Sequence, residues 1–132
     1  LVPAALSKTY RAQRDGSGTV EVLGSPQTRR EFTHVSDISN WTITNLELLE
    51  TWPFAMNLGS GRDDSVQEIF DTAARVTGYS GAFQYSTPEL SGPASRLLDS
   101  SVAVRRFAWN PQIGLEAGMH EIFSQLKGTQ RL

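Results

Sequence analysis

The sequence predicts one small domain of the mixed α/β class, with about five helices and short strands between them. Helical and strand-like periodicities alternate along the 132 residues, and turns rich in glycine or proline separate them. Hydrophobic residues make up 39% of the chain and charged residues 20%, which is typical of a packed globule rather than a disordered chain. A chain of this length favours a single domain, residues 1–132.

The N-terminal segment predicts a helix followed by a strand. Pro3 suits the first helical turn, where its missing N–H costs little, and Ala4 to Arg14 continues the helix. The helix is expected to end at the turn formed by residues 15–18. Residues 19–23 alternate in polarity and include β-branched side chains, which predicts a strand.

The next segment predicts a second extended piece from Arg30 to Val35 and then a helix. Asp37 is expected to cap this helix, which would run from about Ile38 to Glu50. The apolar run from Phe54 to Leu58, followed by Gly59-Ser60-Gly61, predicts a short buried strand.

A capping box opens the next predicted helix, because the side chains of Ser65 and Glu68 can each reach an otherwise unpaired backbone N–H of the other residue. Its apolar residues repeat with helical periodicity from Val66 to Val76, and Gly78 is expected to end it. Residues 82–85 predict another strand.

The C-terminal segment predicts a loop at Ser91-Gly92-Pro93 and a short helix from Ser100 to Phe107. A final amphipathic helix is expected where apolar residues recur on one face: Leu115, Met119, Ile122, Phe123 and Leu126.

Composition excludes several functional classes. Twelve Lys and Arg against fourteen Asp and Glu give a net charge of −2, which argues against a general nucleic-acid binder. The chain has no apolar run of about 18 residues, so no membrane span and no membrane partner are expected. The absence of cysteine excludes disulfides and thiolate chemistry and fits a cytoplasmic location.

Motifs for catalysis, cofactors and metals are missing. Neither a Tyr-x-x-x-Lys pair nor a Gly-Lys-Ser/Thr phosphate loop occurs. Gly59-Ser60-Gly61 supplies the first two glycines of a dinucleotide motif, but Asp64 stands at the third position. His34 and His120 lie far apart in the sequence, and no spacing indicates a metal site. We therefore expect no catalytic, cofactor-binding or metal-binding residues in this chain.

Several cations lie near predicted turns, and most are expected to be solvated surface charges. Arg30 is the best exception, because it lies between a turn and an extended segment that can direct its planar fork toward an anion. His34 is expected to satisfy a nearby backbone group rather than to catalyse. The cations are Lys8, Arg29, Arg30, Arg62, Arg96, Arg105 and Arg106.

An ordered set of motifs resembles the C-terminal part of the GDP-L-fucose synthase family, within the NAD-dependent epimerase/dehydratases and the extended short-chain dehydrogenase/reductases. The set begins with Val22-Leu23-Gly24-Ser25 and residues 29–37, and continues through Asn57-Leu58-Gly59-Ser60-Gly61. It ends with Gly78-Tyr79-Ser80-Gly81, Arg96-Leu97-Leu98-Asp99, Trp109-Asn110-Pro111 and residues 114–118.

The resemblance implies a nucleotide-sugar-binding domain whose N-terminal Rossmann half is absent from the chain. It implies that Arg30 holds the substrate diphosphate, that Lys8 is a basic residue near the substrate, and that Arg96 replaces a lysine in the loop over the nucleotide. It also implies that Leu23 stands beside the nucleotide, where tryptophan is common.

For the full-length enzyme the resemblance implies NADP(H) as cofactor and GDP-4-keto-6-deoxy-D-mannose, or another nucleotide-sugar, as substrate. It also allows a homodimer. The family's cofactor site and catalytic group belong to the N-terminal half, so we expect this chain to be a truncated or proteolytic piece of a two-domain enzyme.

Two departures leave alternatives open. Residues 91–96 read Ser-Gly-Pro-Ala-Ser-Arg, whereas the family pattern is Asp-Gly-Thr-Pro-Arg-Lys, and Leu23 replaces tryptophan. The chain can therefore be the substrate domain of another nucleotide-sugar epimerase or dehydratase. It can also be a non-catalytic, stand-alone binding module.

Overall fold

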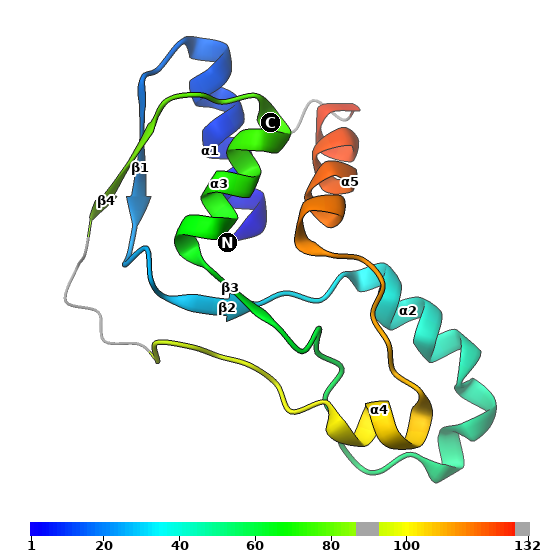
Figure 1. Ribbon diagram of the computed structural model, residues 1–132. Coiled ribbons are helices and arrows are strands. Elements are labelled where there is room, and N and C mark those ends of the chain that lie inside the picture. The colour runs from blue at the N-terminus through cyan, green and yellow to red at the C-terminus, as the bar shows by residue number, and fades with distance from the viewer. Residues whose placement is uncertain (87–92, 129–132) are drawn as a thin grey trace.

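The computed structural model describes residues 1–86 and 93–128 and arranges them in two lobes (Figure 1). The main lobe contains α1 (Val2–Asp15), β1 (Thr19–Leu23), α3 (Val66–Thr77), β4 (Ala82–Ser86) and α5 (Leu115–Gly128). The outer lobe contains α2 (Val35–Thr44), the 3₁₀ helix η1 (Leu46–Thr51) and α4 (Ser101–Phe107). Two three-residue strands, β2 (Arg29–Glu31) and β3 (Asp63–Ser65), lie between the lobes. The mixed α/β class is confirmed.

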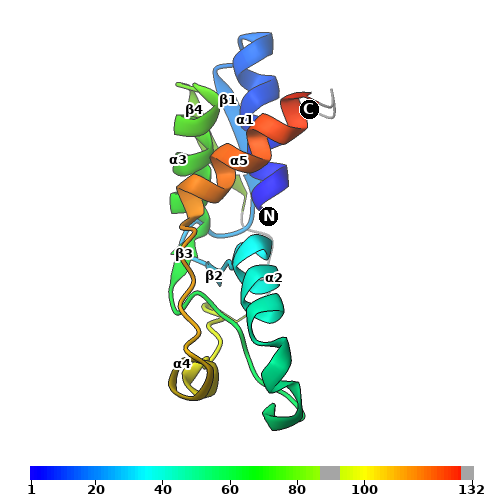
Figure 2. The ribbon, with the colours of Figure 1, turned by 90° about the vertical axis from the view of Figure 1, so that its right-hand side faces the viewer.

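The main lobe holds most of the buried apolar residues. Strands β1 and β4 pair in parallel, from Thr19 opposite Ala82 to Leu23 opposite Ser86. Because side chains alternate along a strand, Val20 and Val22 are buried while their neighbours on β1 face solvent. These two valines pack in one cluster with the apolar faces of α1, α3 and α5 (Figure 2). The larger buried members are Leu6, Val22, Ile69, Phe70 and Met119.

The ends of the main-lobe helices follow the sequence predictions. Gly16 ends α1 with φ of 69° and Gly78 ends α3 with φ of 78°, in the left-handed region that glycine adopts without strain. The capping box at the start of α3 is complete, since the Ser65 hydroxyl accepts from the Glu68 N–H and the Glu68 carboxylate accepts from the Ser65 N–H.

Aromatic side chains form the small core of the outer lobe. Trp41 stacks on Trp52 with ring centroids 5.3 Å apart and meets Phe107 and Trp109 edge to face. The Trp109 Nε1 donates to the carbonyl of Gly59 at 2.7 Å, so this core also fixes the glycine loop. The three tryptophans of the chain therefore report on the outer lobe alone.

The second predicted helix begins and ends earlier than expected. His34, not Asp37, is the N-cap of α2: its backbone is extended and its Nδ1 accepts from the Ser36 N–H at 3.3 Å. The Asp37 carboxylate instead accepts from the N–H groups of Gln112 and Ile113. The structural role predicted for His34 is confirmed. The extended piece predicted from Arg30 to Val35 is too long, because β2 ends at Glu31.

The strand predicted from Phe54 to Leu58 is wrong for this structure. These residues belong to no strand, and Phe54 is fully exposed. Conversely, no pattern in the sequence predicts β3, whose residues Asp63 and Asp64 disfavour strands. Strand β3 forms because it pairs in antiparallel fashion with β2. Of the predicted loop at 91–93, Ser91 and Gly92 lie outside the described residues.

Candidate functional site

Arg29 and Arg30 are adjacent on β2 but point to opposite sides, because side chains alternate along a strand. Arg29 is neutralised by acids: its Nε lies 2.8 Å from Oδ1 of Asp63, and its Nη1 lies 3.2 Å from Oε2 of Glu68. Its Nη2 also donates to the Asp63 carbonyl at 2.6 Å. Arg29 therefore joins β2 to β3 and α3, and its charge is already paired.

Arg30 is anchored without being neutralised. Its Nη1 donates to the carbonyls of Arg29 at 2.5 Å and Pro93 at 3.1 Å. Among the described residues no carboxylate forms an ion pair with it. A half-buried guanidinium that is held by carbonyls through one nitrogen keeps its full charge and its other N–H groups for an external anion.

A segment on the free side of β2 brings a second arginine to the same place. The Arg29 N–H donates to the Ala94 carbonyl at 2.7 Å, and the Glu31 N–H donates to the Arg96 carbonyl at 3.3 Å. These two bonds have the spacing of a parallel strand pair, which sets Arg96 opposite Arg30 and on the same side. Arg96 is exposed, and no carboxylate pairs with it in the part of the chain that the structure describes.

Glu31 fixes this segment from the opposite side of β2 to Arg30. One carboxylate oxygen accepts from the Gly61 N–H at 2.8 Å and from the Ser60 hydroxyl at 3.3 Å. The other accepts from the Leu98 N–H at 2.7 Å. One side chain thus ties together β2, the glycine loop and the segment that carries Arg96.

Asp63 anchors the same segment at a second point. Its carboxylate accepts from the Ser95 hydroxyl at 2.5 Å and from Arg29. The Ser95 hydrogen bond, and then the one from Arg29, hold the pKa of Asp63 below its ordinary value. The acids beside the two free arginines are therefore already engaged as hydrogen-bond acceptors, so they compete less for an anion at Arg30 and Arg96.

The other two predicted binding residues lie on or against β1. Leu23 ends β1 with 70% of its side chain exposed, opposite Ser86, the last described residue before position 93. Lys8 on α1 donates its Nζ to the Glu21 carbonyl at 2.8 Å, so it supports β1 two residues before Leu23. The structure thus brings Arg30 and Arg96 together and places Leu23 and Lys8 along the neighbouring strand.

The glycine loop does not fit a dinucleotide cofactor. Such a cofactor needs free backbone N–H groups for its phosphates. Here the Gly59 N–H donates to the Ser100 hydroxyl at 2.7 Å, and the Gly61 N–H donates to Glu31. Within residues 1–86 and 93–128, no group of three His, Asp or Glu residues is placed to hold a metal ion.

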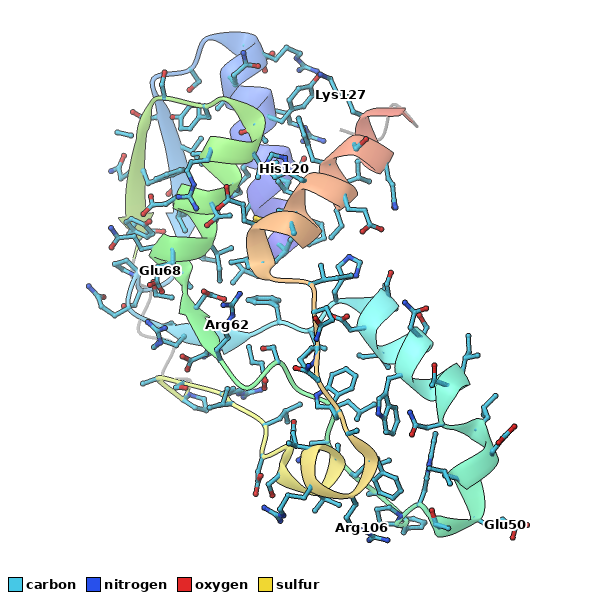
Figure 3. The ribbon with its side chains drawn as sticks, turned by 45° about the vertical axis from the view of Figure 1, so that its right-hand side comes forward. Glu50, Arg62, Glu68, Arg106, His120 and Lys127 are labelled. Carbon is cyan, nitrogen blue, oxygen red and sulfur yellow. The ribbon has the colours of Figure 1, made fainter. Side chains whose placement is uncertain are left out.

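A cavity of about 120 Å³ lies where α5 meets the start of α2, and apolar side chains line most of it. His34 borders this cavity with its side chain 9% exposed, and its Nε2 lies 3.7 Å from Oε2 of Glu121. Gly118 of α5 makes room for the His34 ring. His120 is exposed on α5, away from the cavity and away from Arg30 (Figure 3).

Sequence reasoning identifies Arg30 but gives no role to Glu31, Asp63 or Ser95. Glu31 and Asp63 lie 32 residues apart in sequence and act through backbone groups, so no local spacing reveals them. Taken together, the geometry can hold a compact polyanion: two unpaired guanidinium groups lie on one side of β2, on a loop fixed at several points.

Comparison with known proteins agrees with the motifs. No family model matches the chain. It is 36% identical over 123 residues to the GDP-L-fucose synthase of Azorhizobium caulinodans, covering 93% of this chain and 39% of that protein. It is 32% identical to the Escherichia coli GDP-L-fucose synthase, covering 90% of this chain and 39% of the relative. The GDP-L-colitose synthase of Yersinia pseudotuberculosis is 28% identical, with 90% and 38% covered.

Solved structures show the same fold. The UDP-glucose 4-epimerase of Thermotoga maritima, solved with UDP-glucose, superposes with a TM-score of 0.80 at 23% identity, covering 98% of this chain and 40% of that one. The GDP-mannoheptose C4 reductase of Campylobacter jejuni, solved with NADP bound, gives 0.75 at 22% identity, covering 96% and 46%. No helix within the described residues is long and apolar enough to cross a membrane.

Proposed function

Because this chain is related in sequence to the GDP-L-fucose synthases, we propose that it is the nucleotide-sugar-binding domain of an NADP-dependent epimerase/reductase. The observation that carries the proposal is the pair of unneutralised arginines, Arg30 and Arg96, held side by side at β2. The chain spans about two-fifths of the length of its curated relatives. The activity of a whole enzyme therefore requires further residues.

In this proposal Arg30 binds the substrate diphosphate through the N–H groups that its carbonyl anchors leave free. Arg96 binds the same diphosphate from the loop that lies over the nucleotide. Leu23 packs beside the base, and Lys8 keeps the end of β1 in position. The domain's contribution to the reaction is positioning, since it holds the keto-sugar in place for groups supplied elsewhere.

NADP(H) is assigned to the remainder of the parent enzyme, because the glycine loop of this chain uses its own N–H groups internally. Adding NADPH and GDP-4-keto-6-deoxy-D-mannose to the 132-residue chain is expected to give no oxidation of NADPH. Measurable oxidation by the purified chain would contradict this assignment.

Calorimetric titration of the chain with GDP, GMP and guanosine tests the binding function. We expect affinity to rise with each phosphate, because Arg30 and Arg96 contact the diphosphate rather than the base. Equal affinity for GDP and guanosine would reject the proposal.

The identity of the base is a separate question, since Leu23 stands where the relatives commonly have tryptophan. A thermal-shift comparison of GDP-, UDP- and dTDP-sugars addresses it, and the proposal expects the largest shift with the GDP-sugar. A larger shift with a UDP- or dTDP-sugar would favour the substrate domain of another epimerase or dehydratase.

A further inference from the structure

Residues 54–58 form an apolar segment whose backbone is unpaired. The sequence Phe-Ala-Met-Asn-Leu alternates in the manner of a strand, and it leads from η1 back toward β3 without regular structure (Figure 1). No backbone hydrogen bond joins these five residues to any other described residue. Backbone groups of apolar segments are almost always paired in a finished fold, so this segment has the properties of a strand without a neighbour.

The apolar surface beside this segment is also uncovered. Helix α2 and η1 bury no residue completely, whereas α1 buries five and α3 buries seven. Figure 3 shows this part of the molecule extending away from the main lobe as far as Glu50. Five large apolar side chains are exposed within twelve residues, and Phe54 is the most exposed of them: Ile43, Leu46, Leu48, Leu49 and Phe54. A contiguous apolar patch of this kind marks an interaction surface.

The two ends of the segment are held in place. The Asn57 side chain donates to the Asp99 carbonyl at 3.1 Å, and the Gly59 N–H donates to Ser100. At the other end, Trp52 is stacked on Trp41. The segment is therefore presented at a fixed position, and this lowers the entropic cost of adding a partner strand.

We propose that residues 54–58 become a β-strand by pairing with the edge of a β-sheet outside these 132 residues, and that α2 and η1 pack on the face of that sheet. The occupant is the part of the protein that corresponds to the unmatched length of the relatives, which is more than half of each. This inference rests on the proposed function, because a binding domain of this kind acts together with a second part.

A sheet edge fits this surface better than a helix. A helix would cover the apolar side chains but leave the backbone groups of residues 54–58 unpaired, whereas a strand satisfies both. The alternation also suits burial on both sides, since Phe54, Met56 and Leu58 lie on one face and the small Ala55 on the other.

The proposed strand is directly linked to the anion-binding arginines. Gly59 follows it immediately, and Gly61 donates its N–H to Glu31, the residue that fixes the Arg96 segment. Docking of the sheet is thus expected to order the loop that carries Arg96.

Hydrogen–deuterium exchange tests the proposal in two proteins: the 132-residue chain, and the same chain preceded by the unmatched portion of the Azorhizobium caulinodans synthase. In the chain alone, the amides of residues 54–58 should exchange at nearly the unstructured rate while those of β1 are protected. In the fusion they should exchange at least about a hundredfold more slowly. Strong protection in the monomeric chain, or none in a fusion whose β1 amides are protected, would overturn it.

Variants locate the effect. Met56→Pro removes one backbone N–H and is expected to leave the melting temperature of the chain alone unchanged, but to abolish protection of residues 54–58 in the fusion. Phe54→Leu, which stays apolar, is the matched control and should keep the protection. If Met56→Pro left the protection intact, strand pairing would be refuted.

Two further readouts separate the explanations. Protection that appears in the chain alone only as its mass doubles would assign the surface to a second copy and overturn the proposal. GDP titration of the same samples reports on the proposed function independently, because a chain that binds no GDP can still show or lack the exchange difference.

Discussion

The carboxylate of Glu31 accepts the backbone N–H of Leu98 at 2.7 Å, and this bond fastens the Arg96 segment to β2. The same carboxylate also holds the Gly61 N–H. Arg30 lies one residue before Glu31, so the position of both unpaired arginines depends on a single acidic side chain.

Glu31→Gln is expected to reduce the free energy of unfolding by about 1.5–3 kcal/mol, because an amide presents only one acceptor oxygen and replaces a charged hydrogen bond with a neutral one. GDP affinity should fall as well, since the loop carrying Arg96 loses a restraint. Urea denaturation and calorimetric titration measure the two effects. Glu21→Gln, on the exposed face of β1, is the matched control and should change neither.

Gly118→Ala should destabilise the protein although alanine favours helices. A methyl group at position 118 would lie 2.9 Å from the Cδ2 of the buried His34 ring, which also caps α2. We expect a loss of about 1–3 kcal/mol, the usual cost of overpacking, measured by urea denaturation. Gly128→Ala, whose methyl group would contact nothing within 4 Å, is the control. A more stable Gly118→Ala variant would show that the His34 contact is absent.

The neighbouring acids Asp63 and Asp64 should respond to mutation with opposite signs. Hydrogen bonds from Ser95 and Arg29 lower the pKa of Asp63 below 3.8, so its ionised form stabilises the fold above that pH. That stability should disappear as the pH falls from about 4 through the lowered pKa. Burial raises the pKa of Asp64, so its ionised form disfavours folding at neutral pH.

At pH 7, Asp63→Asn should therefore unfold at a lower urea concentration than the parent, and Asp64→Asn at a higher one. Between pH 5 and pH 3 the Asp63→Asn variant should lose less stability than the parent. A parallel pH dependence for Asp63→Asn and the parent would show that Asp63 carries no such linkage.

Trp109→Phe should loosen the glycine loop while keeping most of the outer-lobe packing. The variant leaves the Gly59 carbonyl without its 2.7 Å bond from Nε1, at an expected cost of about 1–3 kcal/mol for a buried group. Urea denaturation followed by circular dichroism measures this cost, and an unchanged midpoint would contradict the assigned role. Val104→Ala, on the exposed side of α4, serves as the control.

The sequence predicts the main lobe well because its signals are local. The capping pair Ser65 and Glu68, the terminating Gly78 and the alternation around Val22 each act within a few residues, and each is confirmed. The outer lobe is predicted less well. Asp37 has the chemistry of a helix cap, but its carboxylate binds the backbone of residues 112 and 113, which no local pattern encodes.

The predicted strand at residues 54–58 shows the other limit of local reasoning. Alternating apolar residues indicate that a segment can form a strand, but a strand exists only where a second one pairs with it. The candidate site divides in the same way. Arg30 is recognisable from its turn and extended segment, whereas Glu31, Asp63 and Ser95 matter only through contacts across 29 to 67 residues of sequence.

The central claim is that Arg30 binds the diphosphate of a nucleotide-sugar, and the GDP affinity of Arg30→Ala tests it most directly. Calorimetric titration should show that Arg30→Ala binds GDP about 10- to 150-fold more weakly than the parent chain, which corresponds to about 1.5–3 kcal/mol for a hydrogen bond to a charged group. Arg11→Ala, an exposed arginine of α1, should bind as the parent does. Equal GDP affinity in Arg30→Ala and the parent would contradict the account.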